Sequence, residues 1–294
     1  MRPLALALCL LPGLASAEPR LVVMSAFAPE WVALQEGLTD AETETVNGNS
    51  FVTGTLEGQP VVLALSGISM VNAAMTTQML LDRYEVEAIV FSGIAGGVDP
   101  DLSIGDVVVA DRWGQYLDVI MARETADGFA IPPWMSTDFP PFGMMHVRNQ
   151  TVQSARAAEP ETKFWFETDP GLLALAETVA AELDLPACAE DGTCLSEPPR
   201  VVVGGSGVSG AAFVDNADLR EWAFDTFDAR VLDMESAAVA HVAYANEVPF
   251  IAFRSLSDLA GGGDEANEMG TFMGIAAGNA ATVVRAFLGA YAAE

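Results

Sequence analysis

Hydrophobic and polar positions along the chain fall into two recurring patterns. Apolar or β-branched runs of strand length occur at residues 21–26, 50–56, 60–66, 88–97, 105–111 and 250–253. Stretches with helical spacing begin near Pro29 and recur at residues 70–84, 168–185, 236–246 and 264–293. The first pattern predicts buried strands, with a hairpin formed by 50–56 and 60–66, and the second predicts helices. Strands and helices therefore alternate, which is typical of the α/β class.

The segment 231–258 organises this pattern. It predicts a strand end, a short helix, a turn at Pro249 and a second buried strand. Two acids, Glu235 and Asp258, therefore follow strand ends, where open α/β sheets bind their ligands. Either acid alone fits a helix cap or a solvated turn equally well. The pair, together with Asp233 interrupting the apolar run, favours a ligand site.

The periodicity is lost between residues 113 and 167. Prolines and aromatic residues are frequent there, which predicts a long ordered loop region that either lines a pocket or packs over the sheet. Further on, Gly205, Gly207 and Gly210 match the Gly-x-Gly-x-x-Gly pattern of dinucleotide sites. No helix that could bind a phosphate is predicted directly after them, so we disfavour a nicotinamide site.

Length and charge narrow the possible partners. The 294 residues allow one large domain or two small ones, and 13 basic against 41 acidic residues give a net charge of −28. Such a surface repels nucleic acid and anionic membranes, so neither is expected as a partner. His146 and His241 are the only histidines. Because they are few and far apart, we predict no metal site and no histidine-based triad.

The first 17 residues have the features of a secretory signal. A basic residue precedes an apolar run, and Ala15-Ser-Ala17 resembles a cleavage site, so the mature chain is predicted to begin at Glu18 and to be exported to the periplasm or beyond. The run is too short to span a membrane, and Cys9 lies too early for a lipoprotein anchor. Cys188 and Cys194 remain, with five residues between them. In an exported protein this spacing favours a local disulfide over a metal site.

Four segments together share the pattern of one known superfamily. They are Glu30 after the first strand, Gly93 to Val109 with Gly-x-Ala-Gly-Gly and Gly-Asp-Val-Val-Val, Phe213 to Asn216, and Asp233 to Asp258 with Met-Glu before an Ala-rich helix and Ser-Asp after the next strand. On these segments the chain resembles the nucleoside phosphorylase and nucleosidase superfamily, in particular the 5′-methylthioadenosine/S-adenosylhomocysteine nucleosidases. The stretch from Phe213 to Val239 is also similar to plant bark storage proteins.

This resemblance implies an architecture and a class of ligand. The expected fold is a three-layer α/β/α sandwich with a central mixed twisted sheet, nucleoside phosphorylase-like. It forms one domain over residues 18–294, with 113–167 as an irregular insertion. The expected ligand is a small purine nucleoside, with no cofactor and no metal, and the expected assembly is a homodimer or a larger homo-oligomer.

The resemblance also implies roles for individual residues. Asp258 would protonate the leaving base, and Glu30, held by Arg254, would deprotonate a water molecule. Glu235 would accept hydrogen bonds from the ribose hydroxyls. Further substrate contacts are expected from Met234, Phe213, Val214, Ser257, Gly96 and Ile94, with Met234 packing under the sugar and Phe213 against the base.

The expected function is that of an exported purine nucleosidase hydrolysing the N-glycosidic bond of methylthioadenosine-like or related nucleosides. Two alternatives stay open: a nucleoside-binding or storage-type protein without turnover, and a phosphate-dependent phosphorylase. The turn after the first strand has no Arg that could hold phosphate, and Ile94 stands where family members often carry Ser. Both features favour water as the nucleophile.

Overall fold

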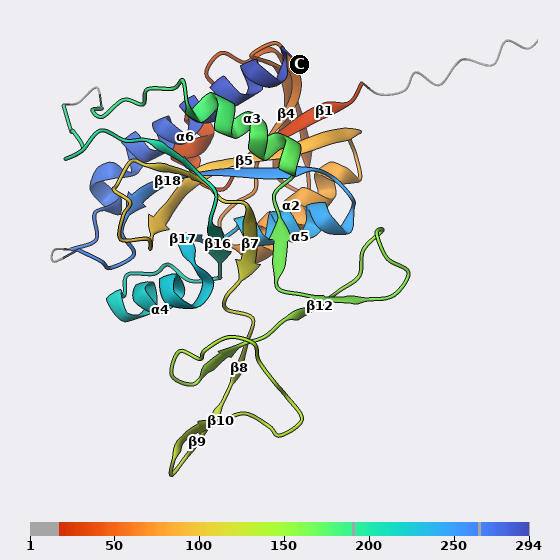
Figure 1. Cartoon of the computed structure of the whole chain (residues 1–294). Helices are drawn as coiled ribbons and strands as arrows, with labels where there is room; N and C mark the ends of the chain where they lie inside the picture. Colours follow the sequence, from red (N-terminus) through yellow and green to blue (C-terminus); the bar gives the residue numbers. More distant parts are fainter. Residues whose placement is uncertain (1–17, 190–191, 264–265, 294) are drawn as a thin grey trace, which may run out of the picture.

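The computed structural model describes residues 18–189, 192–263 and 266–293. The predicted signal peptide lies outside these ranges. One large sheet contains β1 (Arg20–Ser25), β2 (Thr39–Val46), β3 (Asn49–Leu56), β4 (Gln59–Leu65), β5 (Val86–Gly97), β6 (Val107–Val109), β7 (Arg112–Gln115), β14 (Trp165–Glu167), β15 (Val201–Val203), β16 (Ser206–Ser209), β17 (Ala229–Asp233) and β18 (Phe250–Asp258). Its main path runs β14-β7-β16-β17-β5-β1-β4-β3-β2, and β18 joins β5 and β6 beside this path (Figure 1). Parallel pairs such as β1 with β5 and antiparallel pairs such as β17 with β5 coexist, so the sheet is mixed, as predicted.

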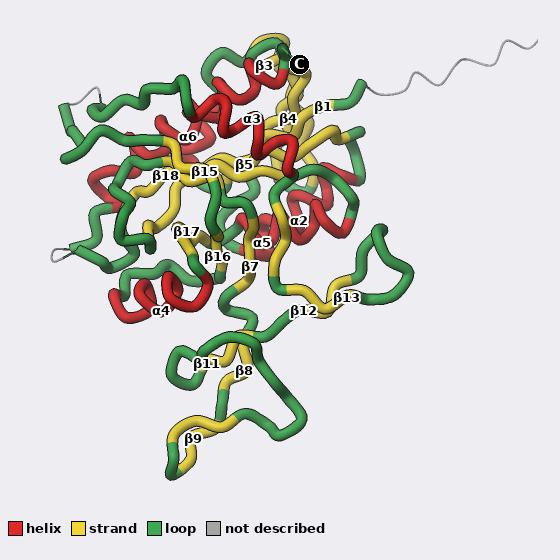
Figure 2. The backbone as a smooth tube through the Cα atoms, viewed as in Figure 1, coloured by secondary structure: helices red, strands yellow, loops and turns green. Residues whose placement is uncertain are grey.

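Helices cover both faces of this sheet. They are α1 (Ala28–Leu34), α2 (Met70–Leu81), α3 (Pro170–Ala180), α4 (Ala217–Phe227), α5 (Ser236–Ala245) and α6 (Met269–Tyr291). Helix α6 packs against β18 and β5 together with α1 and α3, whereas α2 and α5 pack together on the opposite face (Figures 1 and 2). The three-layer α/β/α prediction is therefore confirmed.

The buried strand β1 illustrates why the sheet needs both helical layers. Successive side chains of a strand point to opposite faces. Val22 and Met24 accordingly join the core under α2 and α5, while Leu21 and Val23 join the core under α6. A strand with apolar side chains on both faces needs a covering layer on each face to keep them from water.

The region predicted to be irregular contains several short strands. Four of them, β8 (Val119–Met121), β9 (Arg123–Thr125), β10 (Gly128–Ala130) and β11 (Met145–Val147), pair as two-stranded sheets in a segment that projects from the body (Figure 1). We call residues 119–147 the arm. Strands β12 (Gln150–Val152) and β13 (Glu161–Lys163) follow it and pair with each other. Pairs of three residues are too short to produce a readable alternation, so the sequence did not indicate these strands within the region predicted to be irregular.

Other element boundaries also differ from the predictions. The acidic segment Thr39–Val46 is an edge strand whose side chains are mostly exposed, so it lacks the apolar pattern of a strand. Helix α2 ends at Leu81 and α3 covers Pro170–Ala180, both shorter than predicted, and α6 begins at Met269. The strand predicted at residues 88–97 is β5, which begins slightly earlier, at Val86.

Helix α6 is, among the described residues, the one helix long and apolar enough to cross a membrane. More than half of its most apolar window is buried inside the protein, where Phe287 packs against Phe253 of β18. It is therefore a core helix of the sandwich. Between α3 and β15, Cys188 and Cys194 pair as an isolated antiparallel bridge and are joined by a disulfide.

Candidate active site

A cavity of about 320 Å³ opens where β1, β5, β17 and β18 end. Gly96 of β5 pairs with Leu232 of β17 and also with Asp258 of β18, so these strands bring their terminal residues to one place. Glu30, Glu235 and Asp258 all line the cavity, although each is no more than 5% exposed. The fold thus brings three acids together around a single cavity, although they are far apart along the chain.

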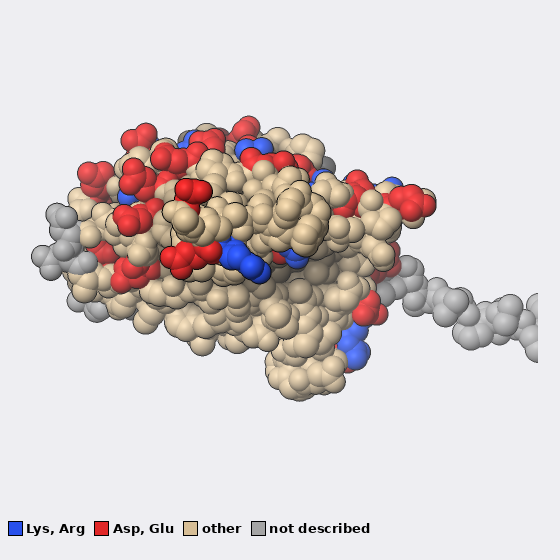
Figure 3. All heavy atoms as spheres, turned by 90° about the horizontal axis from the view of Figure 1, so that it is seen from below, with Lys and Arg blue, Asp and Glu red and all other residues tan. Residues whose placement is uncertain are grey.

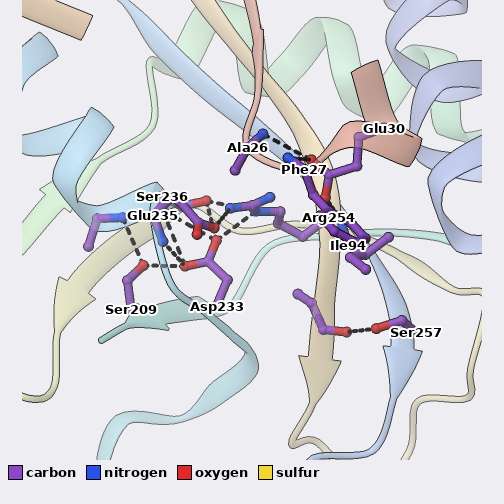
Figure 4. A network of polar contacts seen from close by, with 12 residues as sticks. Ala26, Phe27, Glu30, Ile94, Ser209, Asp233, Glu235, Ser236, Arg254 and Ser257 are labelled. Carbon is purple, nitrogen blue, oxygen red and sulfur yellow. Dashed lines mark hydrogen bonds and ion pairs between the residues drawn. The ribbon is translucent and has the colours of Figure 1, made fainter. Parts of the chain in front are cut away.

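Glu30 is held by backbone groups. Its Oε2 accepts hydrogen bonds from the N–H groups of Ala26 and Phe27, both at 2.9 Å, and its Oε1 accepts one from the N–H of Ile94, also at 2.9 Å (Figure 4). Pro29 at the start of α1 places Glu30 in the first helical turn, where its side chain reaches back to the end of β1. Burial raises the pKa of Glu30, while Arg254 and the three N–H groups oppose that rise.

Arg254 is completely buried and lies behind the cavity wall. Its Nε donates to Asp233 Oδ2 at 2.6 Å and its Nη2 to Glu235 Oε2 at 2.9 Å, and its guanidinium stacks on the ring of Phe91 (Figure 4). Arg254 was expected to hold Glu30, but its hydrogen bonds go to Asp233, Glu235 and the Ser236 hydroxyl instead. The positive charge of Arg254 nevertheless lowers the pKa of Glu30.

Gly93 allows this arrangement to be compact. A β-carbon at residue 93 would lie 2.1 Å from Arg254 Nη1 and 2.8 Å from Glu30 Oε1. The guanidinium and the carboxylate therefore both approach the bare backbone of β5. Only glycine leaves room for this contact.

Glu235 has one partner on each oxygen. Oε1 accepts the backbone N–H of Ser69 at 2.8 Å, and Oε2 accepts Arg254. Burial, with a smaller contribution from the negative charge of Asp233, raises the pKa of Glu235 to about 7, although the positive charge of Arg254 opposes the rise. Ser69 has a φ of 84°, an unusual value for a residue with a side chain, and this conformation accompanies the approach of its N–H to Glu235. Ser69 was not identified as a site residue from the sequence.

Asp258 ends β18 within a small polar cage. It accepts hydrogen bonds from Ser257 Oγ and the N–H of Ala260, both at 2.9 Å, and a longer one from Asn267 Nδ2 at 3.3 Å. Burial raises the pKa of Asp258 despite these donors. A buried carboxyl group of this kind is suited to hold a proton and deliver it to a leaving group. Asn267 was not identified from the sequence, because it follows Asp258 only after a glycine-rich loop.

The remaining predicted substrate residues also lie at the cavity. They are Met234, Phe213, Val214, Ser257, Gly96 and Ile94. Phe213 stands at the mouth with 57% of its surface exposed, so a bound molecule could cover its ring. Phe27, Ile68 and Met269 add apolar lining that sequence patterns did not single out. Within the described ranges, no group of His, Cys, Asp and Glu side chains is arranged to hold a metal ion.

The chain matches a family model described as the phosphorylase superfamily over residues 20–289. The chain belongs to the phosphorylase superfamily. Within this superfamily it is 32% identical to a 5′-methylthioadenosine/S-adenosylhomocysteine nucleosidase of Bacillus thuringiensis (strain Al Hakam), over 82% of this chain and 87% of that protein.

Solved structures of superfamily members agree with the fold. The nucleosidase of the same name from S. pneumoniae, with the transition-state inhibitor MT-ImmA, is 26% identical and superimposes with a TM-score of 0.69, covering 92% of this chain and 99% of that one. The nucleosidase from Colwellia psychrerythraea 34H, in complex with adenine, is 27% identical with a TM-score of 0.69, covering 94% and 97%. The predicted nucleoside phosphorylase-like architecture is thereby confirmed.

Proposed function

We propose that this member of the phosphorylase superfamily hydrolyses the N-glycosidic bond of purine nucleosides of the methylthioadenosine type. The observation that carries the proposal is the set of three buried carboxyl groups around one cavity, each with different hydrogen-bond donors. Different surroundings let the three groups take different protonation states, as glycosidic bond cleavage requires. The names of the relatives and the apolar residues at the cavity mouth support the same substrate class.

In this mechanism, a water oxygen forms a bond to the anomeric carbon of ribose as the carbon–nitrogen bond to the base breaks. Asp258 donates its proton to the departing base, which leaves as a neutral molecule. Glu30 accepts a proton from the attacking water, and ionised Glu235 accepts hydrogen bonds from the ribose hydroxyls while positive charge develops on the sugar. Free base and free sugar are the products.

The setting of Glu30 favours water over phosphate as the nucleophile. Converging backbone N–H groups bind anions, and here the carboxylate of Glu30 already takes those of Ala26, Phe27 and Ile94. Among the described residues that line the cavity, none is Lys or Arg. Arg254 lies behind the wall and is paired with two carboxylates. A phosphate ion would therefore enter a cavity lined by acidic side chains, with no Lys or Arg in the described part of its lining to bind it.

Release of free base from methylthioadenosine, adenosine and inosine, each with and without phosphate, tests this proposal. We expect release without phosphate, and a loss of about 10²- to 10⁴-fold in kcat for Asp258→Asn and for Glu30→Gln. Asp225→Asn, an exposed change on α4, is the matched control and should leave kcat unchanged. Strict dependence on phosphate would establish phosphorolysis. Nucleoside binding without release in any condition would establish the storage-type alternative.

We also propose that the protein is exported. The signal-like residues 1–17 and a disulfide between exposed cysteines, Cys188 and Cys194, support an oxidising location. N-terminal sequencing of protein recovered from the periplasm or the medium should read from Glu18. Protein that stays in the cytoplasm with residues 1–17 attached would refute export.

The proposed assembly is a homodimer in which the arm of one copy covers the cavity mouth of the other. Two surfaces carry exposed apolar side chains. One is the arm, with Met121, Phe129, Trp134, Met135 and Met144; the other is the cavity mouth, lined by Ile68 and Phe213, together with Val71 and Met75 on α2. Much of the remaining surface is acidic, whereas a broad area seen from below carries few charges (Figure 3). In a dimer with a twofold axis, each copy would place its arm over the cavity mouth of the other, so both surfaces would be buried in both copies.

Trp134 is 83% exposed and is the residue to change in a test of this dimer. Light scattering after size exclusion should give twice the monomer mass for the mature chain, and a lower mass for Trp134→Glu at the same concentration. A wild-type monomer at micromolar concentration would refute this assembly.

A further inference from the structure

Asp233 is the most completely bonded of the acids at the site. Its Oδ1 accepts hydrogen bonds from the Ser209 hydroxyl and from the N–H groups of Glu235 and Ser236, and its Oδ2 accepts from the Ser236 hydroxyl and Arg254 Nε (Figure 4). A carboxylate offers about four lone-pair sites. These donors fill them, so Asp233 has none left for a substrate although it borders the cavity.

We propose that Asp233 is a positioning residue that aims the Arg254 guanidinium and thereby sets the orientation and ionisation of Glu235. This inference rests on the proposed nucleosidase function. Asp233 binds Nε, the edge of the guanidinium nearest the chain, and Nη2 then points at Glu235 Oε2 at 2.9 Å. Because a guanidinium is planar and rigid, fixing one edge fixes the direction of the other nitrogens.

The same contacts link Asp233 to the position of Glu235 along the chain. Asp233 accepts the backbone N–H groups of Glu235 and Ser236, the residues at the start of α5. Ser209 on β16 ties the cluster to the neighbouring strand, since its hydroxyl donates to Asp233 and accepts the N–H of Ala237. Asp233 therefore controls both the backbone and the side-chain partner of the proposed ribose-binding acid.

The electrostatic part of the inference follows from the charges that face Glu235. Among the described residues these are Arg254 on β18, Asp233 on β17 and Glu30 on α1. Asp233 raises the pKa of Glu235, and it also neutralises part of the Arg254 charge that lowers it. An uncharged residue at position 233 should therefore lower the pKa of Glu235.

Asp233→Asn tests this through the pH profile of kcat/KM for base release. At the pH optimum we expect kcat/KM to fall by about 100-fold, which is the usual effect of displacing a reacting group by about 1 Å. The acid limb of the profile should move to lower pH, because Glu235 stays ionised to lower pH. A purely structural role would lower the melting temperature and leave the limb in place, and that result would overturn the proposal.

Ser236→Ala provides a second variant that keeps every charge. It removes one donor to Asp233 and one acceptor of Arg254 Nε. We expect a smaller loss of kcat/KM, roughly 10-fold at one lost hydrogen bond, with the acid limb unmoved. If both variants fold and keep wild-type kcat/KM, the guanidinium does not need aiming and the inference fails. If wild-type protein releases no base at all, the proposed function itself has failed, and nucleoside affinity of the variants becomes the readout.

Discussion

Gly93→Ala is the sharpest test of how tightly the site is built. The added β-carbon would lie 2.1 Å from Arg254 Nη1 and 2.8 Å from Glu30 Oε1. Carbon and nitrogen atoms normally make contact at about 3.5 Å, so the guanidinium must withdraw by more than about 1 Å, and the carboxylate must move by a smaller amount as well. Neither can do so freely. Arg254 is bound at 2.6 Å and 2.9 Å to two carboxylates, and Glu30 is bound to three N–H groups.

Two consequences can be measured for this variant. Overpacking of this kind lowers the free energy of unfolding by about 1–3 kcal/mol, which denaturant titration can detect. Displacing a catalytic carboxylate or its partner by about 1 Å lowers kcat/KM by roughly 100-fold. The loss of activity should therefore exceed what the loss of stability explains, since the folded fraction at 25 °C changes little.

Gly278→Ala is the matched control, because nothing lies within 4 Å of a β-carbon placed at that position in α6. The substitution should raise the free energy of unfolding by about 0.5–1 kcal/mol through helix propensity and leave kcat/KM unchanged. Wild-type kcat/KM in Gly93→Ala would refute the reasoning. It would mean that the guanidinium can move away from β5 without cost.

Two further predictions concern ionisation and the disulfide. Because burial raises the pKa of Glu235 to about 7 from its ordinary value of 4.5, its ionised form is less stable in the folded state, so stability from this group falls as pH rises from 4.5 through 7. The free energy of unfolding should be lower at pH 8 than at pH 5, and Glu235→Gln should reduce that difference; an unchanged difference would contradict it. Replacing Cys188 and Cys194 together by Ser should lower the free energy of unfolding by about 2–3 kcal/mol with little change in kcat, and equal melting temperatures with and without reductant would contradict this.

Residue patterns in the sequence by themselves determined the layers of the fold and two of the three acids at the cavity. Strand β1 is apolar at successive positions, which requires cover on both faces, and Glu235 and Asp258 each lie at a strand end. Glu30 was expected at the site only from the resemblance to the superfamily, since its place in the first turn of a helix opened by Pro29 fits a helix-dipole contact as well. These features are local, since they depend on neighbours within a few residues.

The tertiary structure alone decided which groups bond to one another. Arg254 could pair with any nearby acid, and only the antiparallel placement of β17 against β5 brings Asp233 and Glu235 to it while Glu30 turns to backbone donors. The roles of Ser69 and Asn267 likewise depend on loops that meet the acids in space. Sequence patterns report the direction of a side chain relative to its own element, whereas hydrogen-bond partners depend on the packing of elements far apart in the chain.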